Sequence, residues 1–235
     1  MPEPKDTFIP ALRFKRLTPL FDPVVAAMTR ERTFKRRVLD RARLGGADEI
    51  LDLACGTGTL AIAAARLAPG ARVVGVDADP VVLAKARTKA RRGGLDISFD
   101  EAMSTELPYE DGSFDIVLST LFFHHLQDDA KTGSAAEVVR ILRPRGRLIV
   151  GDVGRPQDPV MRLAVLATVQ LLDGFATTAS NVAGRLPAVL RDAGLRDIDV
   201  TDRMRTPTGT VEVITATRGE DLATGPPRDH PVVAK

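Results

Sequence analysis

The sequence predicts an α/β fold in which a doubly wound, mostly parallel sheet carries helices on both faces. Short, nearly continuous apolar runs alternate with longer helical segments, as expected for parallel strands buried between helices. The first such run, at 50–54, turns through a pair of glycines straight into an alanine-rich segment at 60–67. The second run, at 72–76, ends at the acid Asp77, nineteen residues beyond Gly58.

The N-terminal region predicts a helix that covers one end of this sheet. Asp22 fits an N-cap and Pro23 the first helical position, and the helix should run to about Arg43 before the glycines at 45–46 end it. We therefore expect residues 1–44 to form an N-terminal helical lid or cap.

The central part of the chain alternates strands and helices. Beyond the second strand, further strands are expected at 96–99, 114–120 and 147–152, and helices at 80–92 and 131–142. Asp79 should cap the helix at 80–92, and the glycines at 93–94 should end it. Ligands of such sheets bind beyond the carboxyl ends of the strands, where the strand order reverses. Five segments reach that edge: 52–58, 77, 100–104, 119–125 and 152.

The pattern changes beyond residue 155. We expect one helix at 160–174 and a second that is capped by Ser180 and Asn181 and runs to Ala193. Alternating strands at 196–204 and 210–217 then predict a hairpin around Thr206-Pro207-Thr208-Gly209.

The domain organisation that follows is a single folded unit. We expect residues 45–218 to form a cofactor-binding domain and residues 219–235 a flexible tail.

The amino-acid composition limits the classes of protein to which this chain can belong. A chain of 235 residues with 44% hydrophobic and 27% charged residues can bury one large core. The single cysteine, Cys55, excludes an internal disulfide framework and fits a reducing compartment. No signal-peptide pattern and no apolar run near the ~20 residues that span a bilayer occur, so we expect a cytoplasmic protein without a transmembrane segment.

Basic residues crowd two of the expected helices, at 22–43 and 80–92. Such runs could attract nucleic acid or an anionic membrane surface. However, no interleaved aromatic residues support stacking on bases, since aromatic content is only 4%. We therefore expect solvated arginine-rich helix faces rather than a nucleic-acid partner.

The glycine pair and Asp77 indicate a nucleoside cofactor, because an acid at the end of the second strand can accept from both ribose hydroxyls. Gly56-x-Gly58-x-x-Ala61 fits a dinucleotide fingerprint, which would suit a dehydrogenase. Asp52, just before the loop, is poorly placed beside a pyrophosphate but well placed beside a cationic amino-acid cofactor. S-adenosylmethionine (SAM) therefore accounts for more of these residues than NAD.

Five ordered motifs resemble those of class I SAM-dependent methyltransferases. They are LDLACGTG (51–58), VGVDADP (74–80), LPYEDGSFD (107–115), FHHL (123–126) and EVVRILRPRGRL (137–148). Together they look like the branch that includes the ubiquinone/menaquinone-biosynthesis methyltransferases, and the resemblance covers roughly residues 20–155. It implies a Rossmann-like fold whose final antiparallel pair completes a seven-stranded sheet, with SAM as cofactor.

The resemblance also implies the residues that hold SAM. Asp52 and the glycine loop would lie near its methionine portion, Asp77 would take the ribose hydroxyls, and Ala78 would lie against the adenine. The full set of implied cofactor-binding residues is Asp52, Ala54, Cys55, Gly56, Thr57, Gly58, Asp77, Ala78, Met103, Ser104, Ser119 and Thr120.

The chain departs from this family at the adenine position. Members of the branch usually carry an acid there that accepts from the adenine amino group, whereas this chain has Ala102-Met103-Ser104. Met103 can pack on the ring through its polarisable sulfur, and the Ser104 backbone N–H can hold the purine edge. A specific acceptor is missing unless Asp100 or Glu101 supplies it.

His124 and His125 are the candidate catalytic residues, because a histidine near pKa 6.5 can remove a proton from a phenol or hydroxyl. Methyl transfer needs a base only if the acceptor must lose a proton, so turn-capping or packing is an equal alternative for each histidine. We favour His124 for the catalytic part. Adjacent histidines without a third ligand do not make a metal site, and Cys55 is expected to be a packing residue.

The acceptor is the least defined part of the prediction. Phe14, Phe21, Asp22 and Phe175 are candidate substrate-binding residues, and their largely apolar character favours a small quinone-, phenol- or lipid-like acceptor that is methylated at carbon or oxygen. An RNA-modifying methyltransferase and a SAM-binding scaffold without methyl transfer are the alternatives. A homodimer is left open.

Overall fold

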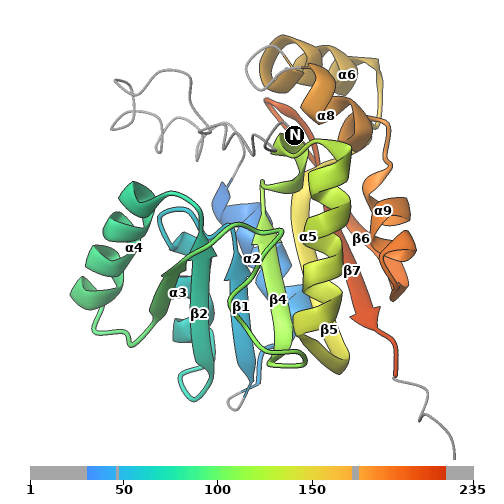
Figure 1. Cartoon of the computed structure of the whole chain (residues 1–235). Coiled ribbons are helices and arrows are strands. Elements are labelled where there is room, and N and C mark those ends of the chain that lie inside the picture. The colour runs from blue at the N-terminus through green and yellow to red at the C-terminus, as the bar shows by residue number, and fades with distance from the viewer. Residues whose placement is uncertain (1–30, 46–47, 171–174, 221–235) are drawn as a thin grey trace, which may run out of the picture.

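The computed structural model describes residues 31–45, 48–170 and 175–220. Within these residues one sheet of seven strands runs through the molecule in the order β3-β2-β1-β4-β5-β7-β6 (Figure 1). The strands are β1 (Glu49–Leu53), β2 (Arg72–Asp77), β3 (Ser98–Glu101), β4 (Phe114–Thr120), β5 (Leu142–Val153), β6 (Leu195–Thr206) and β7 (Gly209–Arg218).

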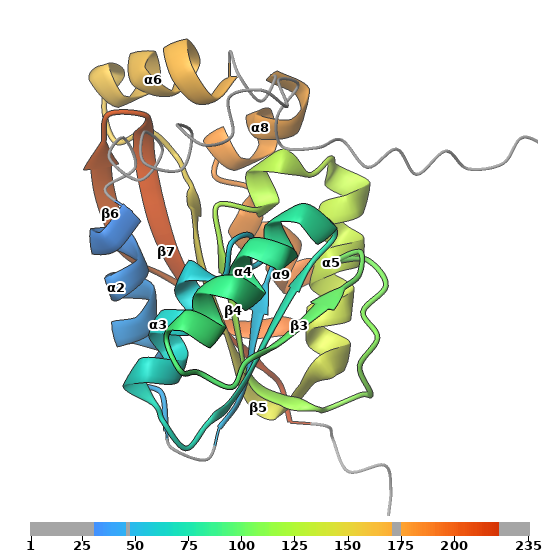
Figure 2. The ribbon, with the colours of Figure 1, turned by 90° about the vertical axis from the view of Figure 1, so that its left-hand side faces the viewer.

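Helices cover both faces of this sheet. One face carries α2 (Glu31–Ala42), α3 (Thr59–Leu67) and α4 (Pro80–Arg92), and the other carries α5 (Asp128–Ile141) and α9 (Leu186–Asp192). A short 3₁₀ turn, η1 (Phe123–His125), follows β4. Above the sheet lie α6 (Pro159–Val165), the π-helical turn η2 (Leu166–Gln170) and α8 (Phe175–Val182) (Figures 1 and 2).

The strand order reverses at β1, which confirms the predicted doubly wound topology. β1 pairs in parallel with β2 on one side and with β4 on the other, so the chain winds outward in both directions from this strand. β7 pairs antiparallel with both β5 and β6, which confirms the C-terminal hairpin and the seven-stranded, mostly parallel sheet. The carboxyl ends of β1, β2 and β4 therefore meet at one edge of the sheet.

Successive side chains of the strands point to opposite faces of the sheet and so belong to two separate hydrophobic cores. In β1, Ile50 packs with α2, α3 and α4, whereas Leu51 and Leu53 face α5 and α9. All three side chains are buried, which explains why the parallel strands read as continuous apolar runs. Helix α2, the described part of the segment expected to form a lid, packs against the sheet, since Phe34 and Val38 are fully buried.

Several predicted boundaries are confirmed and others are shifted; β5, for example, begins at Leu142 rather than at residue 147. Helix α4 has the predicted bounds, and Asp79 caps it by accepting from the Val81 N–H at 2.8 Å. The third strand lies at 98–101 rather than 96–99, because its pairing with β2 continues to the carboxyl end, where Asp77 opposes Glu101. Helix α5 begins at Asp128 rather than at residue 131, and an acid in the first turn suits the helix dipole.

One prediction about the C-terminal helices is modified and another is wrong. The helix expected at 160–174 is α-helical to Val165 and continues as the π-helical turn η2 to Gln170, and its expected end lies outside the described residues. The Thr168 hydroxyl of η2 donates to the carbonyl of Ala164 in α6 and competes with the helical bond. Ser180 and Asn181 do not cap a helix, because they lie inside α8.

The segment after α8 explains why Ser180 and Asn181 do not cap the helix that follows. Gly184 has a φ of 75° and ends the helical conformation after α8, and α9 then begins with Pro187 in its first turn. A proline tolerated at a helix start cannot occupy the interior of one long helix.

Gly75 of β2 is a position where packing forbids any side chain. A Cβ there would lie 2.7 Å from Cδ1 of Phe99 and 2.9 Å from Sγ of Cys55. We expect Gly75→Ala to lower the free energy of unfolding by about 1–3 kcal/mol through overpacking, measured by denaturant titration. Gly219→Ala, where the nearest atom is 3.7 Å away, should be neutral; equal stability of the two variants would contradict the packing seen around β2.

Candidate cofactor and active site

The glycine loop after β1 is a tight turn with left-handed backbone. Ala54, Gly56 and Gly58 all have positive φ, at 56°, 53° and 73°. A Cβ on Gly58 would lie 2.9 Å from Cβ of Ala86, whereas a Cβ on Gly56 would meet nothing within 4 Å. The loop is thus closely packed at Gly58 and open at Gly56, where a ligand can approach the backbone.

Asp77 ties this loop to the end of β2. Its carboxylate accepts from the Gly56 N–H at 2.8 Å through Oδ2 and from the Asp79 N–H at 3.0 Å through Oδ1. Burial raises the pKa of Asp77, although the backbone donors oppose this shift. Each oxygen retains a second lone pair, so the carboxylate can still accept from ligand hydroxyls.

Asp52 lies beneath the same loop and is almost completely buried. Its Oδ2 accepts from the N–H of Ala61, in the first turn of α3, at 2.9 Å, and its Oδ1 has no hydrogen-bond partner among the described residues. Burial raises the pKa of Asp52 to about 7, and the positive charge of Lys35 only partly opposes this. A buried carboxylate with an unsatisfied oxygen fits a cationic ligand group.

The strand ends beside the loop hold the other predicted cofactor residues. Ser119, at the end of β4, is buried and donates through Oγ to the carbonyl of Leu53, while Thr120 is partly exposed. Met103 is 42% exposed, and the hydroxyls of Ser104 and Ser134 lie 2.7 Å apart. The Ser104 side chain is thus directed to α5, which leaves only its backbone for the predicted purine contact.

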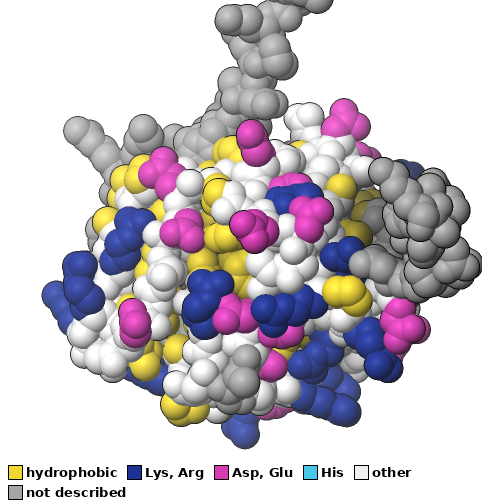
Figure 3. Space-filling view, turned by 60° about the horizontal axis from the view of Figure 1, so that its bottom comes forward, with side chains coloured by type: hydrophobic (Ala, Val, Ile, Leu, Met, Phe, Trp, Pro, Cys, Tyr) yellow, Lys and Arg dark blue, Asp and Glu magenta, His cyan; other side chains and the backbone are white. Residues whose placement is uncertain are grey.

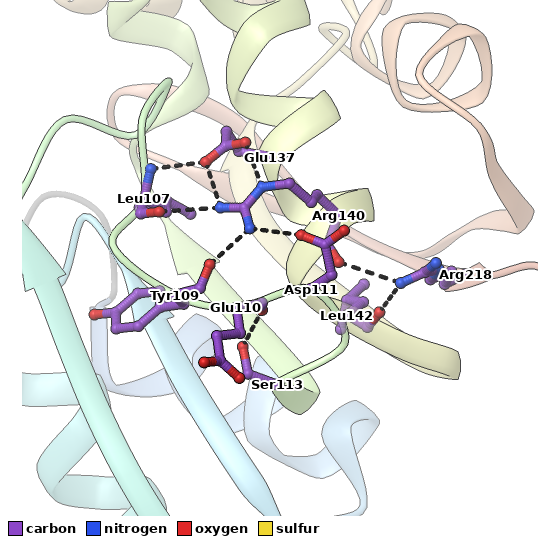
Figure 4. A network of polar contacts seen from close by, with 9 residues as sticks. All are labelled: Leu107, Tyr109, Glu110, Asp111, Ser113, Glu137, Arg140, Leu142 and Arg218. Carbon is purple, nitrogen blue, oxygen red and sulfur yellow. Dashed lines mark hydrogen bonds and ion pairs between the residues drawn. The ribbon is translucent and has the colours of Figure 1, made fainter.

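The segment that follows Ser104 is fixed by one arginine of α5. Arg140 donates to the carbonyls of Leu107 and Tyr109 and to the carboxylates of Asp111 and Glu137 (Figure 4). Glu137 in turn accepts from the Leu107 N–H at 2.7 Å. Hydrogen bonding to Glu137 raises the pKa of Arg140 and lowers that of Glu137, so both stay charged. The motifs at 107–115 and 137–148 therefore meet as a rigid support for this side of the site.

His124 forms a buried pair with Asp152, which the sequence places at the sheet edge without a role. His124 Nδ1 lies 2.5 Å from Asp152 Oδ1, and the His124 N–H donates to Oδ2 at 3.2 Å. Burial would raise the pKa of Asp152, but the charge and hydrogen bond of His124 outweigh it and lower that pKa. The signal that could have identified Asp152 is an acid near the end of the apolar run at 147–153.

His125 differs from its neighbour. Its ring centroid lies 3.9 Å from that of His124, and burial lowers the pKa of His125 to about 3. His125 is therefore neutral at physiological pH and a weak proton acceptor. The Asp152 carboxylate orients the His124 ring, and His124 stays the predicted base.

Other predicted residues have more limited roles or lie outside the described residues. Phe14, Phe21 and Asp22 precede residue 31, and for Phe175 only the backbone, at the start of α8, is described, so their role as pocket wall stays a prediction. Cys55 is buried and its pKa is raised by burial, which fits a packing residue. The described residues contain no cluster of three or more metal-ligating side chains.

The surface shows how charge is distributed away from this site. On the face that carries the amino ends of the parallel strands, Lys and Arg side chains are interspersed with Asp and Glu (Figure 3). Arg143 pairs with Asp115 at 2.6 Å, and Arg72 pairs with Glu49. No helix among the described residues has the length and apolarity needed to cross a membrane.

Comparison with known proteins places this geometry in a family. A family model described as a methyltransferase domain matches residues 50–146. The chain is 40% identical over 145 residues to a demethylmenaquinone methyltransferase of Thermus thermophilus, a match that covers 61% of this chain and 65% of that protein, just under two thirds of its length. It is 32% identical over 215 residues to the methyltransferase GfsG of Streptomyces halstedii, covering 85% of this chain and 73% of that protein.

The fold is similar to that of a SAM-dependent methyltransferase from Methanosarcina mazei, with a TM-score of 0.64 and 22% identity over 78% of this chain and 98% of the other. That likeness shows the overall fold. The buried, unsatisfied Asp52 oxygen further fits the cationic cofactor of such enzymes. The chain thus belongs to the class I SAM-dependent methyltransferases, in the branch that includes the ubiquinone/menaquinone-biosynthesis enzymes.

Proposed function

We propose that this protein transfers a methyl group from SAM to a small, largely apolar acceptor whose ring bears a hydroxyl, and that a quinol- or phenol-like molecule is methylated at carbon or oxygen. The observation that carries the proposal is the buried His124–Asp152 pair, which lies at the same carboxyl-end edge of the sheet as the glycine loop. Relatives named demethylmenaquinone methyltransferase, at 40% and 35% identity, support a quinone-related acceptor. A relative named ubiquinone/menaquinone biosynthesis C-methyltransferase, at 32% identity, supports methylation at carbon.

The residues that would hold SAM each match one part of it. Asp52 would face the positively charged methionine end, the loop at 54–58 would lie along it, and Asp77 would accept from the ribose hydroxyls. When bound, SAM supplies a methyl group made electrophilic by a positively charged sulfur. The protein contributes alignment of the acceptor, close approach and exclusion of water.

The His124–Asp152 pair would supply the base. Asp152 accepts from the Nδ1–H of His124 and so favours the tautomer in which Nε2 is the basic nitrogen. His124 would take the proton of an acceptor hydroxyl, and the electron pair left on oxygen would form the new bond to the methyl carbon from oxygen or from the adjacent ring carbon. The bond between sulfur and methyl breaks in the same step. After attack from carbon, the ring proton would be lost to water, and the oxygen would take back the proton held by His124, so that one proton is released overall and the ring is aromatic again.

An RNA substrate has less support. Two basic residues of α4 form hydrogen bonds within the protein, since Lys89 donates to the Thr57 hydroxyl and Arg87 donates to the Phe99 carbonyl. Acidic residues interrupt the basic surface in Figure 3, so no continuous track for a phosphate backbone is visible on that face.

A radiolabel experiment tests the proposed function. The protein is incubated with SAM labelled at the methyl group, together with reduced 1,4-naphthohydroquinone in one reaction and bulk tRNA in another. We expect label in the organic extract of the first reaction only. Label in RNA would replace the proposal with the RNA-modifying alternative. SAM binding without label in either reaction would favour the scaffold alternative.

The raised pKa of Asp52 predicts pH-dependent cofactor binding. In the free protein this carboxyl is protonated below about pH 7, and a cationic ligand binds better to the carboxylate, so binding must release the proton. We expect the Kd for SAM to rise as pH falls below 7, approaching tenfold per pH unit, and to be flat just above it. Calorimetric titrations between pH 5.5 and 7.5 measure this. Asp52→Asn should bind SAM more weakly and lose the slope; an unchanged slope in that variant would assign the proton to another group.

A further inference from the structure

Helix α8 buries polar side chains on its inner face. Thr178, Ser180 and Asn181 are all buried on this short helix, and Ser180 and Asn181 are only 7% and 1% exposed. In contrast, α3, α4 and α9 bury apolar side chains. Burial of polar groups costs free energy unless they are hydrogen-bonded, so a polar inner face needs partners.

Two of these side chains have polar atoms without such partners. Ser180 Oγ and Asn181 Oδ1 are buried and make no hydrogen bond to the described residues. The orientation of the Asn181 amide is set by its other end, since Nδ2 donates to the carbonyl of Val153 at 3.3 Å. A flipped amide would place two carbonyl oxygens against each other, so the unsatisfied atom is a hydrogen-bond acceptor.

This acceptor atom belongs to the region around the His124–Asp152 pair. Val153, to which Asn181 is bonded, directly follows Asp152 in β5, and α8 packs against η1, which carries His124. The N-terminal part of α8 is held as well, because the buried Lys131 of α5 donates through Nζ to the carbonyl of Thr177 at 2.9 Å. Figure 1 shows α8 beyond the carboxyl end of β5 and beside the start of α5. Two anchors thus fix Ser180 and Asn181 in place.

We propose that Asn181, assisted by Ser180, is a specificity-determining residue that accepts a hydrogen bond from a second hydroxyl of the acceptor molecule. The inference rests on the proposed function, in which His124 takes the proton of a first hydroxyl. A ring with two hydroxyls, a hydroquinol, can donate to both His124 and Asn181. The oxidised quinone offers only carbonyl oxygens, which cannot donate to His124 or to Asn181 Oδ1, so this subsite selects the reduced form.

Binding measurements test this subsite without requiring turnover. Protein loaded with S-adenosylhomocysteine is titrated anaerobically with 1,4-naphthohydroquinone and with 4-methoxy-1-naphthol, which keeps one hydroxyl and replaces the other by an ether. We expect wild type to bind the hydroquinone at least about tenfold more tightly. Asn181→Leu should reduce this preference to about twofold or less, mainly by losing affinity for the hydroquinone.

Thr178→Val is the matched control, because it changes another buried polar residue of α8 and should keep the preference. Ser180→Ala, the smaller change, serves if Asn181→Leu does not fold, and should lower the preference at least threefold. Wild type that binds the two compounds equally or binds neither, or an Asn181→Leu protein that weakens both equally, would overturn the proposal. Methyl transfer that fails while the preference persists would refute the proposed function and leave the subsite.

Discussion

Replacement of Asp152 by asparagine is expected to lower kcat by about 10²- to 10⁴-fold while the Kd for SAM stays unchanged. Asparagine keeps the shape of the side chain but removes the charge that supports the His124 imidazolium as it takes a proton. Its amide can also donate to Nδ1, which would leave the wrong ring nitrogen protonated. Single-turnover methyl transfer, measured with the acceptor identified by the radiolabel experiment, gives the effect on the chemical step.

Asp202→Asn is the matched control for a buried acid outside the site. Asp202 lies on β6 and pairs with Arg37 and Arg41 of α2, and those arginines lower its pKa against the opposing effect of burial. This variant should lose stability and keep its rate. If Asp152→Asn instead retained wild-type kcat, proton removal by His124 would not limit the reaction and the pair would be structural.

Asp77→Ala is expected to raise the Kd for SAM by at least about 100-fold. The change removes a charged acceptor for the ribose hydroxyls, and hydrogen bonds to a charged group contribute about 1.5–3 kcal/mol each. It also releases the Gly56 N–H, which Asp77 holds at 2.8 Å, so the glycine loop loses its link to β2. Calorimetric titration with SAM and with S-adenosylhomocysteine should show the same loss, because both carry the same ribose.

The neighbouring acid Asp79 separates ligand binding from local stability. Asp79→Ala removes the N-cap of α4 and should lower stability by about 0.5–2 kcal/mol with little effect on SAM affinity. Wild-type affinity in Asp77→Ala would remove the ribose assignment, and equal losses in the two variants would attribute the effect to the β2–α4 connection as a whole.

The architecture could be predicted because its signals are local. Asp79 and Pro80 mark the start of α4, the glycines at 93–94 mark its end, and the buried strands read as apolar runs. The turn between β6 and β7 is set by Pro207 and Gly209 in the same way. Each of these features depends on residues within a few positions of one another, so the sequence alone contains the information.

The residues that complete the site are distant in sequence, and local patterns do not reveal them. His124 and Asp152 are 28 positions apart and meet only because β4 and β5 are neighbours in the sheet. Lys131 looks like a solvated helix residue, yet its side chain is fully buried under α8. Asn181 resembles a helix cap by residue type, whereas the tertiary fold turns it inward to bond Val153.

Thermal unfolding with SAM, S-adenosylhomocysteine and NAD compared side by side tests the central claim, that the edge formed by Asp52, the loop at 54–58 and Asp77 is a SAM site. A ligand at 100 times its Kd stabilises the folded protein by about 2.7 kcal/mol, which moves the midpoint of a domain of this size by roughly 5–10 °C. We expect such a shift with both adenosyl ligands and none with NAD. A shift with NAD alone, or with none of the three, would contradict the assignment.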